Sequence, residues 1–190
     1  MARCYSADMG KRQSIRGQMV PQCLLLTDAR NDTGLERAIR RLPRGSALVF
    51  RHYHLRVAER RQRFRRLAAL ARANGVSVIG ARVPAHWRCD GVYGSAQEVA
   101  GRAGLRLATA HSLREIATAA RAGADAVLLS PVFATRSHPG GRALGPLRFL
   151  MLARQSPLPM IALGGMTRQR AARLSSAGPI AGWAAIDGLA

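Results

Sequence analysis

The chain has 190 residues, of which 48% are hydrophobic, and a formal net charge of +20. That length and apolar content suit one globular core and leave little room for a second domain. There is no run of eighteen apolar residues and no apolar stretch near the start, so we expect neither a membrane span nor a secretory signal, and a cytoplasmic protein. Cys4, Cys23 and Cys89 are odd in number and form no CxxC pair, which argues against a disulfide framework or a zinc site.

Residues 1–20 show no sustained periodicity and are predicted to form a flexible tail, with the fold beginning near Pro21. From there short apolar runs alternate with longer segments rich in Arg and Ala, as in repeated β-then-α units. The predicted strands are Cys23–Thr27, Ala47–Phe50, Ser77–Ile79, Gly91–Tyr93, Arg106–Thr109, Ala126–Leu129, Met160–Leu163 and Ile180–Ala185. Eight such strands predict an α/β fold, a compact (β/α)8 TIM barrel over residues 21–190.

The predicted helices are Thr33–Leu42, Leu55–Asn74, Ala96–Ala103, Ser112–Ala122, Pro146–Arg154 and Arg168–Ala177. The helix that should follow the third strand is expected to be reduced, because the segment Ala81–Asp90 is short and contains Pro84. The final helix is expected to be missing or truncated, because the chain stops at Ala190. An uncovered strand edge or apolar face would then favour a homo-oligomer.

The positive charge is almost entirely arginine, and much of it lies in the helix predicted over Leu55–Asn74. Its apolar residues fall on one stripe, and Arg56, Arg60, Arg63 and Arg66 fall on another. This pattern favours a solvated outer face. Binding to nucleic acid is not expected, since the aromatic residues that stack on bases are scarce.

Gly164 and Gly165 follow the predicted seventh strand, where backbone amides can approach an anion closely and the helix beginning near Thr167 adds its positive dipole end. The alternative is a tight turn without a ligand. The long loop after the sixth strand carries Thr135, Arg136, Ser137 and His138, whose donors suit a phosphate or pyrophosphate. A mobile surface loop is the competing interpretation.

His111 follows the predicted fifth strand. Ser112 and Glu115 are explained as a capping box of the next helix, which leaves His111 without a structural role. A histidine at the mouth of a barrel can exchange protons near neutral pH. The alternative is a structural histidine that only makes hydrogen bonds.

Three segments occur in a recognisable order: TAHS at 109–112, GADAVLLSPVFATRSHP at 123–139 and PMIALGGM at 159–166. In this order the chain resembles the thiamine phosphate synthase and TenI family, most closely from Leu105 to Gly188. The resemblance implies a (β/α)8 barrel of thiamine biosynthesis. Synthases of this family join an aminopyrimidine pyrophosphate to a thiazole phosphate with Mg2+, and TenI proteins isomerise the thiazole phosphate.

The resemblance also implies roles for single residues. Arg51 corresponds to an arginine that contacts pyrophosphate, and Thr109 and His111 to a Ser-x-His element whose histidine is implicated in proton transfer. Thr135 and Ser137 correspond to the Thr-x-Thr of the pyrophosphate loop, and Gly164 and Gly165 to the glycines that hold the thiazole phosphate. With Arg136 and His138, these residues form the expected substrate site.

The chain departs from the family pattern at the metal and pyrophosphate positions. Tyr53 and His138 replace two lysines, and Gly80-Ala81 replaces the Asn-Asp whose aspartate binds Mg2+. Glu98 lies near a second acidic metal position, and one carboxylate makes a weak site. We therefore expect Mg2+ as a cofactor only if the synthase activity is retained.

Asp187 lies where the family has a small polar residue beside the phosphate, so either its side chain points away or the phosphate site is altered. The expected function is that of an enzyme that binds a small phosphorylated thiazole or pyrimidine ligand and isomerises or couples it. The alternative is a non-catalytic barrel that binds a phosphorylated ligand.

Overall fold

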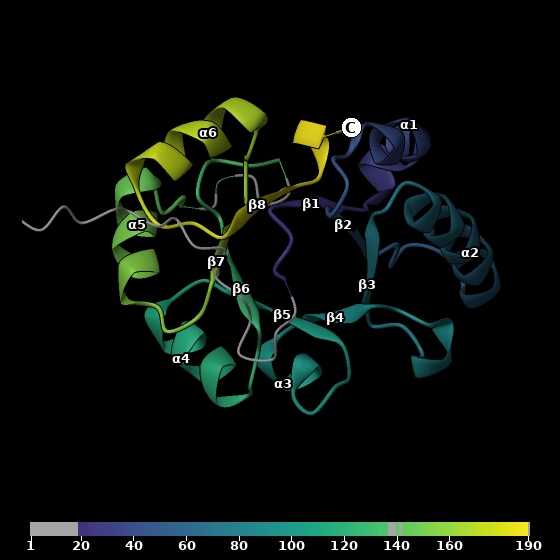
Figure 1. Ribbon diagram of the computed structural model, residues 1–190, viewed down its shortest axis with the longest axis horizontal. Helices are drawn as coiled ribbons and strands as arrows, with labels where there is room; N and C mark the ends of the chain where they lie inside the picture. Colours follow the sequence, from purple (N-terminus) through teal and green to yellow (C-terminus); the bar gives the residue numbers. More distant parts are fainter. Residues whose placement is uncertain (1–18, 137–139, 141, 190) are drawn as a thin grey trace, which may run out of the picture.

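The computed structural model describes residues 19–136, 140 and 142–189. Eight parallel strands form a closed ring in sequence order, with β1 paired to β8. Figure 1 shows this ring at the centre of the molecule with the helices around it. The strands are β1 (Cys23–Leu26), β2 (Ala47–Phe50), β3 (Ser77–Ala81), β4 (Gly91–Gly94), β5 (Leu105–Ala110), β6 (Ala126–Leu129), β7 (Met160–Ala162) and β8 (Gly182–Ala185). The predicted TIM barrel is confirmed.

Helices of unequal length cover the ring. The α-helices are α1 (Leu35–Arg41), α2 (Val57–Ala73), α3 (Ala96–Val99), α4 (Leu113–Arg121), α5 (Pro146–Gln155) and α6 (Arg168–Ala177). Three short 3-10 helices are η1 (Ala29–Gly34), η2 (Ala85–Trp87) and η3 (Asp187–Leu189). The segment between β3 and β4 contains only η2, which confirms that the helix after the third strand is reduced. The short 3-10 helix η3 follows β8.

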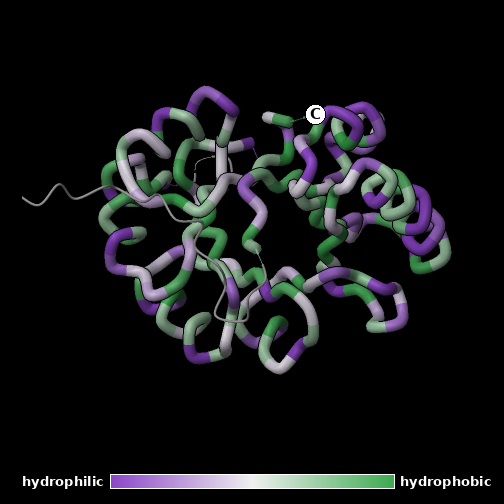
Figure 2. Tube along the Cα trace, in the orientation of Figure 1, coloured by the Kyte–Doolittle hydropathy of each residue, from purple (hydrophilic) through white to green (hydrophobic). Residues whose placement is uncertain are grey.

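The strands are mostly apolar because both of their faces are buried, and Arg106 of β5 is a buried exception. Leu24 and Leu26 of β1 point into the barrel, where they pack with Val49 and Ile79. Leu25 points outward into the cluster that contains Phe64 of α2. Figure 2 shows the corresponding hydrophobic colour along the central strands. This pattern explains why continuous apolar runs predicted the strands well.

Some predictions about the periphery are wrong. Helix α3 ends at Val99 rather than at Ala103, because the backbone turns extended at Ala100 and left-handed at Gly101. Val20, assigned to the tail, is buried in the barrel interior. The closure of β1 on β8 leaves the ring without the uncovered strand edge that was expected.

The arginine stripe of α2 is also less exposed than predicted. Arg56 and Arg66 are exposed, whereas Arg60 and Arg63 are half-buried and bind protein oxygens. The charge on this helix therefore has internal partners as well as solvent. Over the described part of the chain, none of the helices has the length and apolar character that crossing a membrane requires.

Candidate active site

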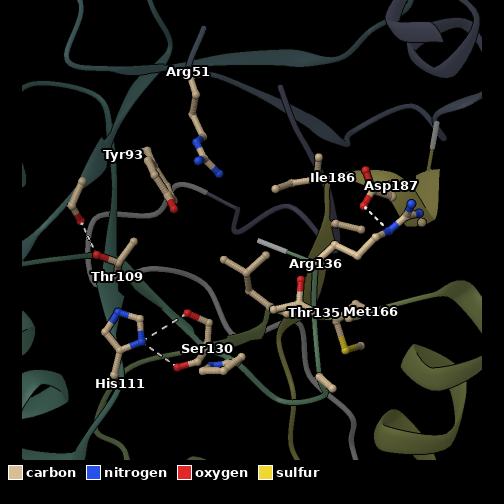
Figure 3. A pocket seen from close by; sticks show the side chains of 18 of the residues that line it. Arg51, Tyr93, Thr109, His111, Ser130, Thr135, Arg136, Met166, Ile186 and Asp187 are labelled. Carbon is tan, nitrogen blue, oxygen red and sulfur yellow. Dashed lines mark hydrogen bonds and ion pairs between the residues drawn. The ribbon is translucent and has the colours of Figure 1, made fainter. Parts of the chain in front are cut away.

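A pocket of about 810 Å3 opens at the carboxyl ends of the strands, where TIM barrels place their ligands. It is lined by eight of the residues that the sequence singled out: Arg51, Glu98, Thr109, His111, Thr135, Arg136, Gly164 and Gly165. Ser137 and His138 lie outside the described residues. The lining residues that were not predicted as site residues include Arg82, Tyr93, Ser130 and Arg142. Figure 3 shows Arg51, Tyr93, Thr109, His111 and Ser130 around the same pocket.

His111 lies at the end of β5 with its ring held from one side. Its Nδ1 lies 2.7 Å from the backbone oxygen of Ser130, and its amide donates to the Glu115 carboxylate over 2.9 Å. A carbonyl oxygen only accepts, so Nδ1 carries a proton, and in the uncharged tautomer the lone pair is on Nε2. The imidazole can therefore accept a proton at Nε2 from a ligand in the pocket.

The diglycine after β7 is fixed by the loop after β6. The oxygen of Gly164 accepts a hydrogen bond of 3.0 Å from the Phe133 amide, and the oxygen of Gly165 accepts one from Arg170. Both glycines have positive φ, of 95° and 60°. Their carbonyls face these partners, and α6 begins just beyond, with Thr167 as its N-cap. This geometry suits an anion at the pocket side of the two amides.

Tyr93 and Thr109 lie on neighbouring strands at the floor of the pocket. The Thr109 hydroxyl donates to the Gly94 oxygen over 3.3 Å. Burial raises the pKa of the Tyr93 phenol to about 12, so the hydroxyl is protonated at neutral pH. It has no hydrogen-bond partner among the described residues, and Figure 3 shows it pointing into the pocket. Tyr93 is thus a donor available to a ligand.

Asp187 faces the pocket and does not point away from it. Its Oδ2 lies 3.8 Å from Nε of Arg136, as Figure 3 shows, and 3.6 Å from Nη1 of Arg30. Two guanidinium groups therefore offset the negative charge that stands where a small polar residue was expected. The Asp187 carboxylate is therefore part of an ion-pair cluster that lines the pocket.

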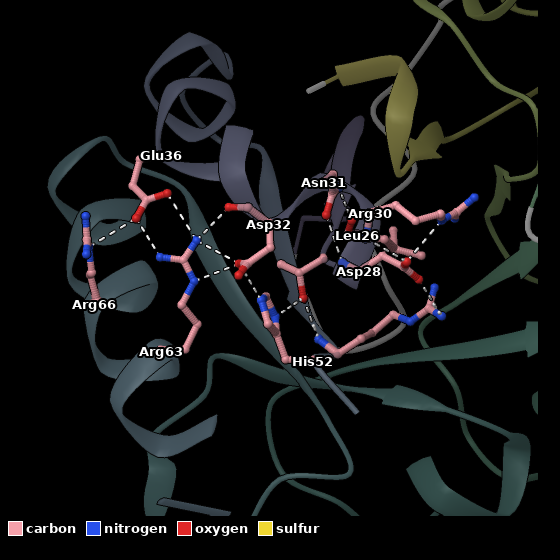
Figure 4. A network of polar contacts seen from close by, with 11 residues as sticks. Leu26, Asp28, Arg30, Asn31, Asp32, Glu36, His52, Arg63 and Arg66 are labelled. Carbon is pink, nitrogen blue, oxygen red and sulfur yellow. Dashed lines mark hydrogen bonds and ion pairs between the residues drawn. The ribbon is translucent and has the colours of Figure 1, made fainter. Parts of the chain in front are cut away.

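The backbone of Arg51 is held by a chain of hydrogen bonds that continues through His52 to Asp32, and Figure 4 shows the contact between His52 and Asp32. Its amide donates to the Thr27 hydroxyl over 2.8 Å, and that hydroxyl lies 2.7 Å from Nδ1 of His52. The Asp32 carboxylate only accepts, so Nε2 of His52 donates to it over 2.8 Å, and Nδ1 of the neutral ring accepts from the Thr27 hydroxyl. Burial holds the pKa of His52 below its usual value although Asp32 opposes that shift. His52 is therefore a neutral structural link at the base of Arg51.

The residues at the expected metal position do not fit a divalent cation. Glu98 accepts from Nε of Arg82 at 2.6 Å through one oxygen and from the Ser95 amide at 2.7 Å through the other. Both hydrogen bonds hold the pKa of Glu98 below its usual range, and the hydrogen bond from the Ser95 amide has the larger effect. Gly80 and Ala81 offer no side-chain oxygen, and the described residues contain no cluster of three groups able to hold a metal. A hard cation requires more free oxygen ligands than remain here.

The fold and the pocket together define a (β/α)8-barrel protein whose ligand site lies among arginines, a histidine and a diglycine turn. A family model described as thiamine monophosphate synthase matches residues 23–189. The chain belongs to this family, the thiamine monophosphate synthase and TenI family.

Individual relatives agree with this assignment. A protein of Aquifex aeolicus named as a second thiamine-phosphate synthase is 37% identical over 62 residues, which is 33% of each chain. The matched segment thus spans about a third of that relative. The thiamine phosphate pyrophosphorylase of Pyrococcus furiosus superposes with a TM-score of 0.72 at 22% identity, over 87% of this chain and 85% of the other. The corresponding protein of Bacteroides thetaiotaomicron gives a TM-score of 0.55 at 14% identity, over 88% and 82%.

These structural likenesses establish the fold, and the family model establishes the membership. Membership supports the expectation of an enzyme with a role in thiamine biosynthesis. The reaction and the ligand follow from neither.

Proposed function

We propose that this protein binds a thiazole phosphate in the barrel pocket and isomerises it, with His111 as the group that moves the proton. The observation that carries this proposal is the hydrogen bond from Nδ1 of His111 to the Ser130 oxygen, which leaves Nε2 as the proton acceptor. The amides of Gly164 and Gly165 hold the phosphate, and the α6 dipole adds to its stabilisation.

The proposed isomerisation requires few functional groups in the pocket. An isomerisation of this kind takes a proton from one position of the ligand and returns it at another, with no co-reactant and no leaving group. Nε2 of His111 accepts the proton in the first half and donates it in the second. A phosphate anchor and one acid/base group are sufficient, and both line the same pocket.

A second candidate is the coupling of thiazole phosphate to the aminopyrimidine pyrophosphate. The observation in its favour is that Arg51 and Arg82 line the pocket in addition to the diglycine, so that two anionic groups have partners. This reaction must stabilise the charge on departing pyrophosphate, for which the family uses Mg2+. The poor fit of the metal position places coupling second to isomerisation.

The test uses purified protein with the thiazole phosphate tautomer alone and, separately, with thiazole phosphate, the aminopyrimidine pyrophosphate and Mg2+. We expect isomerisation in the first mixture and a fall in kcat of about a hundredfold or more in His111→Gln. The control His86→Gln removes an exposed histidine of η2 outside the pocket and should leave kcat unchanged.

Each other outcome contradicts a stated part of the proposal. Thiamine phosphate in the second mixture, without turnover in the first, would make coupling the function. Binding of thiazole phosphate without turnover in either mixture would make the protein a non-catalytic barrel. Turnover that survives in His111→Gln would assign the proton transfer to another residue.

A further inference from the structure

Arg82 is the residue that immediately follows β3, next to the Gly80-Ala81 pair that replaces the expected metal ligand. Its Nε donates to Glu98 Oε1 over 2.6 Å, and both side chains line the pocket. The guanidinium thus binds the same carboxylate that a divalent cation would need. Its side chain is 68% exposed, and its terminal nitrogens make no hydrogen bond to the described residues.

The backbone at Arg82 is held in an unusual conformation. Its φ of 50° lies in the left-handed region, which is unfavourable for a residue with a side chain. The guanidinium of Arg60 opposes this cost by donating to the backbone oxygens of Arg82 at 3.0 Å, Ala81 at 2.7 Å and Arg51 at 2.9 Å. One side chain of α2 therefore fixes the ends of β2 and β3 relative to each other.

Tyr53 brings two guanidinium groups to the same edge of the pocket. The Cζ atoms of Arg51 and Arg82 each lie 5.6 Å from the centre of its ring. The ring face attracts both cations and offsets part of their mutual repulsion. Nε of Arg51 is buried and has no hydrogen-bond partner in the described part of the chain, so it is a donor without an acceptor.

From this arrangement we infer that Arg82 takes the place of the divalent cation, and that the pocket binds a pyrophosphate or similar polyanion through Arg51 and Arg82 without metal. A guanidinium group can donate two parallel hydrogen bonds to one phosphate group, and it carries a permanent positive charge. The two arginines can therefore offset charge of the ligand without a metal ion. Glu98 is then a positioning residue that orients Arg82. The inference rests on the proposed function only for the location of the ligand and is independent of proton transfer by His111.

The experiment is a calorimetric titration of the full chain with inorganic pyrophosphate, once in EDTA and once in Mg2+. We expect equal affinity in the two buffers within about twofold. In Arg82→Ala the affinity should fall by about tenfold or more, as expected when one charged hydrogen-bonding group is lost, and Arg82→Lys should lie between the two. Arg102→Ala, an exposed arginine outside the pocket, is the matched control and should bind like the wild type.

Three results would overturn the inference: binding that requires Mg2+, unchanged affinity in a folded Arg82→Ala variant, or no binding in either buffer. Titration with Mg2+ alone gives a check that does not depend on folding of the arginine variants. Saturable Mg2+ binding that disappears in Glu98→Gln would restore Glu98 as a metal ligand. Loss of isomerisation in His111→Gln with pyrophosphate binding intact would separate this inference from the proposed function.

Discussion

Asp187 Oδ2 lies 3.6 Å from Nη1 of Arg30, and this contact joins the end of β8 to the turn after β1 at the rim of the pocket. Arg30 also binds Asp28, whose carboxylate reaches Arg51 at 3.7 Å. Arg30 and Arg51 at the rim are thus partnered by carboxylates. A phosphate bound as proposed would compete with Asp187 for the same cations.

Replacing Asp187 with serine should strengthen phosphate binding. The substitution removes a like charge from the pocket and leaves Arg30 and Arg136 with more capacity for the ligand. We expect the affinity for thiazole phosphate to rise by about tenfold, equivalent to about 1.4 kcal/mol. Fluorescence or calorimetric titration measures this directly. Glu59→Gln, which removes a carboxylate outside the pocket, should change nothing, and weaker binding in Asp187→Ser would show that the carboxylate assists the ligand.

Gly165→Ala should lower the unfolding free energy more than the backbone conformation of Gly165 alone explains. Its φ is 60°, and an added Cβ would lie 2.5 Å from the Ala134 oxygen. Gly101→Ala is a matched control, because its φ is 66° and its Cβ would meet nothing within 4 Å. The control should lose about 1 kcal/mol of unfolding free energy, and Gly165→Ala about 1–3 kcal/mol more. Urea unfolding of both variants tests this, and equal losses would contradict the close approach seen at Gly165.

Stability should depend on pH through the buried His52. Burial lowers its pKa in the folded state below the unfolded value, so the unfolded chain binds more protons as the pH falls. The stabilisation is therefore complete above the unfolded pKa and is lost as the pH falls below the ordinary histidine value of about 6.5. Melting temperatures of the wild type should drop over this range more steeply than those of His52→Gln. A parallel decline in the two proteins would exclude His52 as the cause, and His86→Gln serves as the exposed-histidine control.

Arg60→Ala should destabilise the protein, because Arg60 links the carboxyl ends of β2 and β3. The substitution leaves three backbone oxygens without their charged donor, which we expect to cost about 2 kcal/mol of unfolding free energy. Arg61→Ala, an exposed neighbour on the same helix, should cost less than about 0.5 kcal/mol. Chemical denaturation of the pair gives the comparison. Equal stability of the two variants would refute the role of Arg60 as a link between strand ends.

The barrel could be predicted because its signals are local. Strands buried on both faces give short apolar runs, and those runs mark all eight strands within a few residues. The last residue of α3 could not be predicted, although Gly101, a residue type that often follows the end of a helix, lies two residues beyond it. The prediction that the arginine stripe of α2 is solvated is wrong at Arg60 and Arg63. Their partners belong to other segments of the chain, and the periodicity of a helix does not reveal such contacts.

The candidate site was predictable where it depends on strand ends. His111 and the diglycine follow apolar runs directly, and the structure brings them into one pocket. Arg82 also follows a strand, and that position alone could have singled it out. Ser130 and the pairing of Asp187 with Arg30 could not be found in this way, because they arise from contacts between distant segments.

The proposed function requires one pocket that holds the phosphate at Gly164 and Gly165 and the thiazole within reach of His111. A crystal structure of the protein soaked with thiazole phosphate is the decisive measurement. We expect density for the phosphate against the two glycine amides, with the thiazole ring facing Nε2 of His111. Phosphate density elsewhere, or a ring turned away from His111 at full occupancy, would contradict it.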